Sequence, residues 1–205
     1  MHTTGLPVAE WNGALLYDVA GLPGLDAAAG WFAERGMPWG LLVPAELDVA
    51  PPRFRYVADQ QLMVRDLEEL PALPNQPLRW DAPAEDVAVV QAAAFEMPLD
   101  EARAFVAPKL GNPTCDVVVA NDQDGQPVAS ATGVLVDGVV AVFGVGTLPS
   151  HRRQGLGSAV TLAVLHRARD QGADLAYLNP SDLGYGAYRK LGFLDAPGWR
   201  IWSPL

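Results

Sequence analysis

The chain of 205 residues has one cysteine, no long apolar run and few basic residues. The single cysteine, Cys115, excludes an intrachain disulfide and a zinc site built from cysteines. No apolar stretch approaches the ~20 residues of a membrane-spanning helix. The 14 lysines and arginines face 24 acids, which gives a net charge of −10 and disfavours a broad nucleic-acid-binding surface. We therefore expect a protein that binds neither nucleic acid nor a membrane.

The N-terminus and the histidines point away from export and from metal binding. Residues 1–10 lack a cationic stretch followed by an apolar core, so they do not resemble a secretory signal. The three histidines, His2, His151 and His166, lie in unrelated contexts and form no metal-binding pattern. We expect a cytoplasmic protein without a metal site.

The chain does contain enough apolar sequence for a folded core, since 50% of its residues are hydrophobic and 19% are charged. A proline-rich junction, Leu70 to Pro77, cannot continue a helix or a central strand. We interpret it as a linker between an N-terminal segment, residues 1–75, and a second domain, residues 76–205. The pattern of the first segment predicts, in order, a helix, a strand and a hairpin, at 25–35, 39–43 and 54–65.

The second domain shows a regular alternation of predicted strands and helices. Proline and acids mark helix starts, β-branched runs mark strands, and Asp137-Gly138 is a typical hairpin turn. The expected elements are strand 78–80, helices 81–95 and 99–106, strands 115–120, 128–136 and 139–145, helix 156–171, strand 173–178, helix 182–191 and a terminal pair of strands within 193–202. This order, β-α-α-β-β-β-α-β-α-β-β, predicts an α/β fold with a mixed sheet and helices on both faces.

A glycine-rich loop, Arg152-Arg153-Gln154-Gly155-Leu156-Gly157-Ser158, separates a predicted strand from the predicted helix 156–171. Unpaired backbone N–H groups at a helix N-terminus form a binding site for an anion, and glycine lets a phosphate approach the backbone. No Asp or Glu occurs from Gly138 through Arg169, although the chain is acidic as a whole. A locally cationic segment in an acidic protein indicates a specific anionic ligand. The loop lacks the Gly-Lys-Ser/Thr of a P-loop, which disfavours nucleotide hydrolysis.

These loop residues also have ordinary structural explanations. The two glycines could serve close packing of the helix. Arg152 and Arg153 could be solvated charges, because backbone amides rather than side chains hold a phosphate in this arrangement. The loop alone is therefore a weak signal.

Three motifs in the right order resemble the GNAT superfamily of N-acetyltransferases, over about residues 78–205. Arg152-x-x-Gly155-x-Gly157 matches the family's pyrophosphate-binding pattern, Gln/Arg-x-x-Gly-x-Gly/Ala. Upstream, Val145 to Pro149 falls where the family has the end of its fourth strand. Downstream, Ala187 to Phe193 is similar to a second signature, a helix that ends in Tyr-x-x-x-Gly-Phe.

The resemblance implies that acetyl-CoA is the co-substrate. Backbone amides from Arg153 to Ser158 would hold the pyrophosphate, and Val145 to Thr147 would run beside the pantetheine arm in a gap between splayed fourth and fifth strands. Asn179, at the end of the fifth strand, would hydrogen-bond the pantetheine, although it precedes a proline and could merely shape a turn. The implied cofactor-binding residues are Val145, Gly146, Thr147, Arg152, Arg153, Gln154, Gly155, Leu156, Gly157, Ser158 and Asn179.

The resemblance also implies direct attack of a neutral amine on the thioester. Tyr188 matches the family's tyrosine and would be the general acid, because a phenol stays protonated at pH 7 and can donate to the departing thiolate. Tyr188 could instead be a core aromatic residue. Many relatives carry a basic carboxylate on the fourth strand, but Val139 to Val145 contains neither a carboxylate nor a histidine. The alternatives are a base from elsewhere, proton loss through water, or catalysis by proximity alone. The candidate bases are Glu96, Asp116, Asp137 and His151.

The acceptor and the N-terminal segment are open at this stage. We expect a small-molecule amine or a protein amine as acceptor, and a homodimer is compatible with the sequence. The missing strand carboxylate keeps an alternative function in view, that of a catalytically silent acyl-CoA-binding or regulatory module. By element order alone, residues 1–75 loosely resemble a degenerate half of the same fold.

Overall fold

The computed structural model describes residue 1 and residues 12–205, and the chain divides into two compact units. One unit contains residues 1–62 and 195–205, and the other contains residues 63–194. The expected proline-rich boundary therefore lies inside the second unit. The chain passes between the units within strand β3 (Phe54–Asp66) and at the start of strand β9 (Leu194–Pro204). Residues 2–11, which include His2 and most of the stretch 1–10 that lacks a secretory signal, lie outside the described residues.

The second unit is built on a mixed sheet, whose strands follow the order β3-β8-β7-β6-β5-β4. Neighbouring strands are antiparallel except for β7 and β8, which run parallel. The strands of this unit besides β3 are β4 (Leu78–Arg79), β5 (Cys115–Asn121), β6 (Pro127–Val136), β7 (Val139–Thr147) and β8 (Leu175–Leu178). The predicted mixed α/β fold is confirmed.

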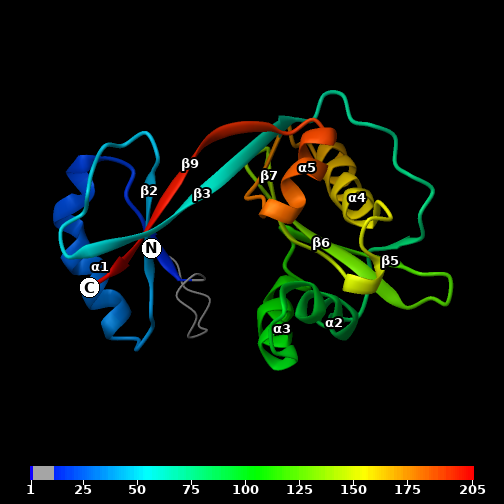
Figure 1. Cartoon of the computed structure of the whole chain (residues 1–205), viewed down its shortest axis with the longest axis horizontal. Coiled ribbons are helices and arrows are strands. Elements are labelled where there is room, and N and C mark those ends of the chain that lie inside the picture. The colour runs from blue at the N-terminus through cyan, green and yellow to red at the C-terminus, as the bar shows by residue number, and fades with distance from the viewer. Residues whose placement is uncertain (2–11) are drawn as a thin grey trace. The chain divides into compact units, whose positions relative to one another are not determined.

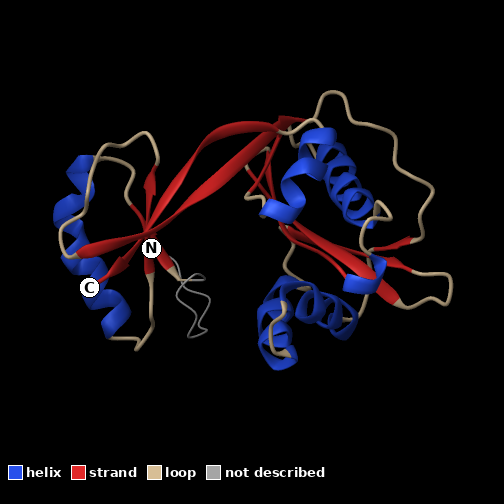
Figure 2. Cartoon of the chain, in the orientation of Figure 1, coloured by secondary structure: helices blue, strands red, loops and turns tan. Residues whose placement is uncertain are grey.

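Helices cover both faces of this sheet, as Figure 1 shows. On one face α4 (Leu156–Asp170) and α5 (Asp182–Lys190) pack, and α4 contributes most of its buried side chains to the largest core cluster. On the other face α2 (Ala84–Phe95) and α3 (Leu99–Val106) form a smaller core with β5. Figure 2 shows the same alternation of helices and strands along the chain.

Two glycine positions explain the geometry of the central hairpin. Asp137 and Gly138 join β6 to β7 with φ of 49° and 78°, so this turn has the two positive φ values of a tight type I′ hairpin. On β6, a Cβ added to Gly133 would lie 2.6 Å from Val164 Cγ1 on α4. Glycine at 133 therefore lets α4 approach the sheet closely.

The first unit has its own sheet and core. Its strands follow the order β1-β2-β9-β3, with β1 (Gly13–Leu15) parallel to β2 (Gly40–Pro44) and β2 antiparallel to β9. A 3-10 helix (Val19–Gly24) leads into helix α1 (Leu25–Ala33), which buries Phe32 against Trp39 with ring centroids 4.8 Å apart. Helix α1 and strand β2 confirm the helix predicted at 25–35 and the strand predicted at 39–43, whereas β1 was not predicted. The origin of the segment as a degenerate half of the fold stays a proposal.

Two predictions about strands are wrong. The expected hairpin at 54–65 is one continuous strand, β3, and the expected terminal pair is also one strand, β9. A tight hairpin turn needs positive φ, and none of the residues in either strand has one. Gly198 serves another purpose, since a Cβ there would lie 2.2 Å from the carbonyl oxygen of Gln60. The glycine allows a close approach of two strands rather than a turn.

Candidate functional site

The parallel strands β7 and β8 pair only at their start. Their register covers Val139 to Ala141 on β7 and Leu175 to Tyr177 on β8. β7 then continues to Thr147, whereas β8 ends at Leu178. The two strands therefore separate beyond Ala141, as the resemblance led us to expect, and leave the second half of β7 unpaired on that side.

A β-bulge interrupts β7 in this unpaired half. On β6, Ser130 pairs with Gly146 and Thr132 with Phe143, so Gly144 and Val145 together face one residue of β6. Gly144 has a φ of +56°, which is the left-handed conformation of a bulge glycine. Within the described residues neither Gly144 nor Val145 has a register partner. The bulge thus removes Val145 from the regular hydrogen-bond ladder at the mouth of the gap.

Helix α4 begins beside this gap without a side-chain cap. Its N-cap is Gly155, with φ of 80° and ψ of 0°, and its first turn contains no acidic residue. The first intrahelical bond after the cap runs from Ala159 N to Gly155 O, at 2.9 Å. The preceding N–H groups, those of Leu156, Gly157 and Ser158, have no intrahelical acceptor because of their position in the first turn. They form the positive end of the helix dipole.

A cleft of about 840 Å³ runs along these elements. This volume lies within the ~300–1,000 Å³ range of small-molecule and cofactor sites. The end of α2, the bulged part of β7, the glycine loop and one face of α5 supply its walls. Nine of the eleven predicted cofactor-binding residues line it: Val145, Gly146, Thr147, Arg152, Arg153, Gly155, Leu156, Gly157 and Ser158. Gln154 and Asn179 are not among the described residues that line the cleft, and their predicted contacts stay predictions.

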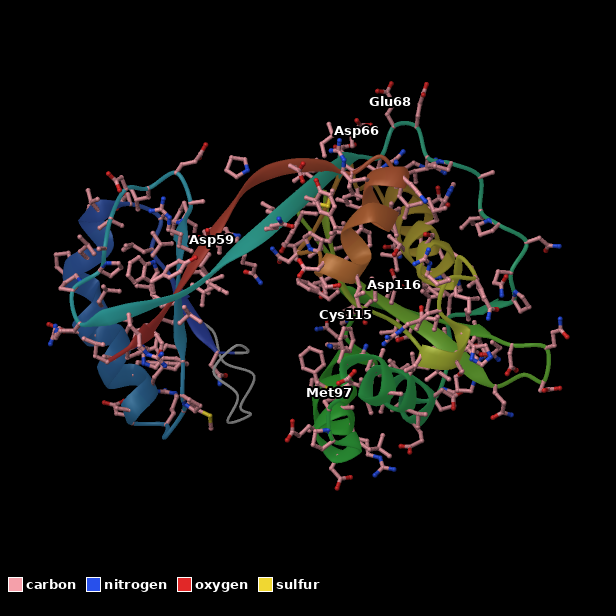
Figure 3. The ribbon with its side chains drawn as sticks, viewed as in Figure 1. Asp59, Asp66, Glu68, Met97, Cys115 and Asp116 are labelled. Carbon is pink, nitrogen blue, oxygen red and sulfur yellow. The ribbon has the colours of Figure 1, made fainter. Side chains whose placement is uncertain are left out.

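The cleft is basic although the protein is acidic. Its charged lining residues are Arg152, Arg153 and Lys190, and among the residues that the structure describes no carboxylate lines it. A smaller hollow of about 290 Å³ has the opposite character, since it is lined by Asp66, Glu68 and Glu69 besides one arginine and one glycine. Figure 3 labels Asp66 and Glu68 at that place. Of the two hollows, the larger cleft suits a polyanionic ligand.

Arg152 makes contacts within the protein as well. Its Nε donates to Thr147 O at 3.4 Å, and its Nη2 donates to Ala94 O at 3.3 Å. Ala94 O lies in the C-terminal turn of α2, where the helix dipole favours a positive charge. Arg152 therefore connects the glycine loop to β7 and to α2, in addition to its place in the cleft wall.

Tyr188 lies on α5 and faces the same cleft. Its ring packs on the core edge-to-face with Phe193, at a centroid distance of 5.9 Å. Gly184 makes room for this ring, because a Cβ there would lie 2.8 Å from Tyr188 Cε2. Burial raises the pKa of the Tyr188 phenol to about 12. The hydroxyl is therefore a proton or hydrogen-bond donor across the physiological pH range.

The structure separates the four candidate bases. Only His151 lines the cleft. Its Nδ1 lies 2.9 Å from Ser150 Oγ, and its Nε2 lies 3.9 Å from Asp122 Oδ2. Ser150 belongs to the 3-10 turn that precedes the glycine loop, and Asp122 belongs to the connection between β5 and β6.

The remaining three bases are outside the cleft lining. Asp116, labelled in Figure 3, accepts from Arg167 Nε at 2.6 Å and from Gln171 Nε2 at 3.0 Å, so it belongs to an ion-paired cluster. Asp137 is part of the β6–β7 turn, and Glu96 is the left-handed C-cap of α2.

Sequence reasoning missed part of the cleft wall. Phe95 at the end of α2 and Leu183 on α5 line it, with 48% and 85% of their surface exposed. Ser181 is the N-cap of α5 and Lys190 its last residue. Two signals were available: the cap pattern of Ser181, and a lysine in a chain that has only two of them. The exposed apolar side chains had no such signal.

Comparison with known proteins agrees with this architecture. A family model described as the acetyltransferase (GNAT) family matches residues 78–193. A solved GCN5-related N-acetyltransferase from Kribbella flavida is 27% identical with a TM-score of 0.71, and the match covers 94% of this chain and 78% of that one. A search of curated proteins found no match.

More distant structures share the fold alone. A conserved protein of unknown function from Staphylococcus epidermidis has a TM-score of 0.73 at 15% identity, with 97% of this chain and 86% of that one covered. A GCN5-related N-acetyltransferase from Sphaerobacter thermophilus has a TM-score of 0.65 at 16% identity, with 90% and 68% covered.

Two kinds of feature are absent from the described residues. None of the helices there is long and apolar enough to cross a membrane. Likewise, no group of three or more His, Cys, Asp or Glu side chains is arranged there to hold a metal ion.

Proposed function

The chain belongs to the GNAT acetyltransferase family, and from that membership we propose that it transfers an acyl group, most simply acetyl, from acetyl-CoA to a primary amine. The transfer is direct, within a complex that holds both substrates. The observation that carries the proposal is the cleft in which a helix N-terminus, three basic side chains and the splayed β7 meet.

The glycine loop would bind the diphosphate of the thioester substrate. The first-turn residues of α4 line the cleft, their N–H groups have no intrahelical acceptor, and the turn contains no acidic residue. Gly155 adopts a φ that favours glycine, and at Gly157 an added Cβ would make only ordinary contacts, at 3.5 Å from Thr147 Oγ1. Arg153 and Lys190 add positive charge on the cleft wall. These residues match the chemistry of a diphosphate.

The bulged end of β7 would bind the pantetheine arm. Val145, Gly146 and Thr147 line the cleft, and β8 does not pair with this part of the strand. A backbone N–H near Val145 would donate to the thioester carbonyl and stabilise the negative charge that develops on its oxygen. Removal of one such donor elsewhere costs about 3 kcal/mol of transition-state stabilisation.

Tyr188 would donate to the sulfur as it leaves. Its phenol faces the cleft and is neutral at pH 7, because burial raises its pKa to about 12. The amine attacks as the free base, the C–N bond forms, the C–S bond breaks, and the nitrogen then loses a proton. No candidate carboxylate lines the cleft, so we propose that this proton leaves through water.

Ligand binding and turnover test the proposal separately. Thermal unfolding with acetyl-CoA, CoA or ATP identifies the ligand class, since a ligand at 100 times its dissociation constant stabilises the fold by about 2.7 kcal/mol. Thiol release in the presence of a panel of small amines and peptides then tests the transfer.

We expect stabilisation by acetyl-CoA and CoA, and thiol release with at least one amine. Stabilisation by ATP alone would refute the acetyl-CoA assignment. Binding of acetyl-CoA without release from any amine would favour the catalytically silent binding module. Cytoplasmic location and a homodimer stay predictions.

A further inference from the structure

A buried glutamine lies directly behind the β7 bulge. Gln91, on α2, is 1% exposed, and its Nε2 donates a long hydrogen bond of 3.5 Å to Gly144 O. A Cβ added to Gly144 would lie 2.6 Å from this nitrogen, so the bulge glycine and the glutamine are fitted to each other. The side chain thus holds the residue that precedes Val145 in the cleft wall.

The other end of this amide has no partner. Gln91 Oε1 is buried without a hydrogen bond in the part of the chain that the structure describes. The same holds for two hydroxyl oxygens on β6, Ser130 Oγ and Thr132 Oγ1, and both residues are fully buried. An unsatisfied buried polar group costs about 1–3 kcal/mol, so three together need an explanation.

The register places both hydroxyls on the face of the sheet that α2 covers, on either side of the bulge that Gln91 contacts. Ser130 and Thr132 pair across the sheet with Val119 and Val117, which belong to the core beneath α2 and α3. Side chains directly opposite each other point to the same face, so both hydroxyls face α2. On β7 they flank the bulge, because Ser130 pairs with Gly146 and Thr132 with Phe143.

We propose that Gln91 is a positioning residue for acyl transfer, which holds the β7 bulge through Gly144 and through buried water shared with Ser130 and Thr132. Buried water that makes about three hydrogen bonds is the usual partner of such groups. The proposal rests on the proposed function. The bulge matters for acyl transfer because it positions the Val145 N–H, which would contact the thioester carbonyl. Gln91 itself lies behind the strand and does not touch the substrate.

Two substitutions of Gln91 test this role. Gln91→Met keeps the length and removes both hydrogen-bonding atoms. It should leave the affinity for CoA within about twofold and lower kcat by about 10- to 100-fold, the loss that a small misplacement of a reacting group causes. Val89→Thr, at a partly exposed position of the same helix, is the matched control and should keep the wild-type kcat.

Gln91→Glu adds a readout that a general loss of packing would not produce. Burial raises the pKa of a carboxyl at this position, and Ser130, Thr132 and Gly144 around it carry no charge. Two charged groups stand at this end of α2: Arg152, which donates to Ala94 O, and Glu96, the C-cap of the helix. The protonated acid can donate to Gly144 O as the amide does, whereas the carboxylate cannot.

The kcat of Gln91→Glu, relative to wild type, should therefore rise as the pH falls through this raised pKa. The amide resonance of Val145 should follow the same titration, and it can be recorded without any turnover. A high-resolution crystal structure should show ordered water within hydrogen-bond distance of Gln91 Oε1.

Three results would overturn the proposal: wild-type kcat in Gln91→Met, a Gln91→Glu profile parallel to the wild type, or a Val145 resonance that does not titrate. If Gln91→Met does not fold, Gln91→Glu and the resonance still decide. If the wild-type protein binds acetyl-CoA but transfers the acyl group to no amine, the proposed function is refuted instead. The Val145 resonance of Gln91→Glu then tests only whether residue 91 positions the bulge.

Discussion

Replacing Tyr188 by phenylalanine tests how the proposed acid works. The change removes one hydroxyl and keeps the ring, so the edge-to-face contact with Phe193 remains. Because burial raises the pKa of Tyr188 to about 12, the phenol is a weaker acid than an ordinary tyrosine. The departing thiol of CoA resembles a cysteine thiol, with a pKa near ~8.5.

The difference between these two pKa values sets the expected effect. Complete proton transfer from the Tyr188 phenol to the thiolate is uphill by ~3.5 pKa units, or on the order of 5 kcal/mol. In the proposed reaction Tyr188 would therefore act as a hydrogen-bond donor to a charged sulfur rather than as a full proton donor. Such a bond contributes about 1.5–3 kcal/mol, so Tyr188→Phe should lower kcat by about 10- to 150-fold.

Thiol release from pH 7 to 10.5 measures this effect. We expect the ratio of wild-type to Tyr188→Phe kcat to stay constant over this range, since a phenol with a pKa of about 12 stays almost entirely protonated up to pH 10.5. Tyr185→Phe makes the same change on α5 at a residue that packs on the core and is not among those lining the cleft, and it should keep the wild-type kcat. An unchanged kcat in Tyr188→Phe would refute the donor role. A ratio that falls to one near pH 10 would refute the raised pKa.

Three further substitutions test the loop, the core and a buried charge. Gly155→Ala puts a side chain at a φ of +80°, which should cost about 1–2 kcal/mol and weaken acetyl-CoA binding in calorimetric titration, whereas Gly157→Ala makes only ordinary contacts within the protein and should keep the wild-type stability. Gly133→Ala places a Cβ 2.6 Å from the stiff side chain of Val164 and should lower the free energy of unfolding in urea by about 1–3 kcal/mol; unchanged stability would contradict this packing. Burial lowers the pKa of Lys109 from 10.5 to about 8, so the unfolded chain binds more protons between these pH values and stability rises with pH across them. Lys109→Met should therefore stabilise the protein at pH 7 by up to about 3 kcal/mol and flatten that rise in urea unfolding curves, and a less stable variant at pH 7 would contradict it.

Much of the fold could be predicted because its signals are local. The β6–β7 hairpin follows from Asp137-Gly138, which adopts the two positive φ values that this turn needs. Helix α4 follows from an apolar face that begins directly after Gly155. The strands β3 and β9 were each predicted as two strands because their polar residues and Gly198 look like turn signals. Glycine is needed at 198 for another reason, the close approach of the Gln60 backbone. That contact joins residues far apart in the sequence, and no local pattern records it.

In the candidate site, too, the residues in local motifs could be predicted and those that depend on distant partners could not. Motif residues such as Gly155 and Tyr188 could be found because the chemistry depends on a short spacing. The bulge at Gly144 could not, since a bulge is defined by the strand that it faces. For Gln91 the available signal was a single amide among Val87, Ala88 and Val90 on a buried helix face. A polar residue at an apolar position indicates a partner across the core but does not say which one.

The net charge of the protein and the charge of the cleft act in opposite directions on an amine acceptor. Amine acceptors are cationic at neutral pH, and a net charge of −10 attracts them at long range. The cleft opposes this attraction, because Arg152, Arg153 and Lys190 line it without a carboxylate among the described residues. Each such cation repels an ammonium group by about 0.4 kcal/mol at ~10 Å in water, before screening by salt. Long-range attraction to the protein and a weak repulsion in the cleft thus act together on a cationic amine, and salt reduces both. For the proposed ternary complex we therefore expect the amine to approach the bulge of β7 from outside the basic part of the cleft.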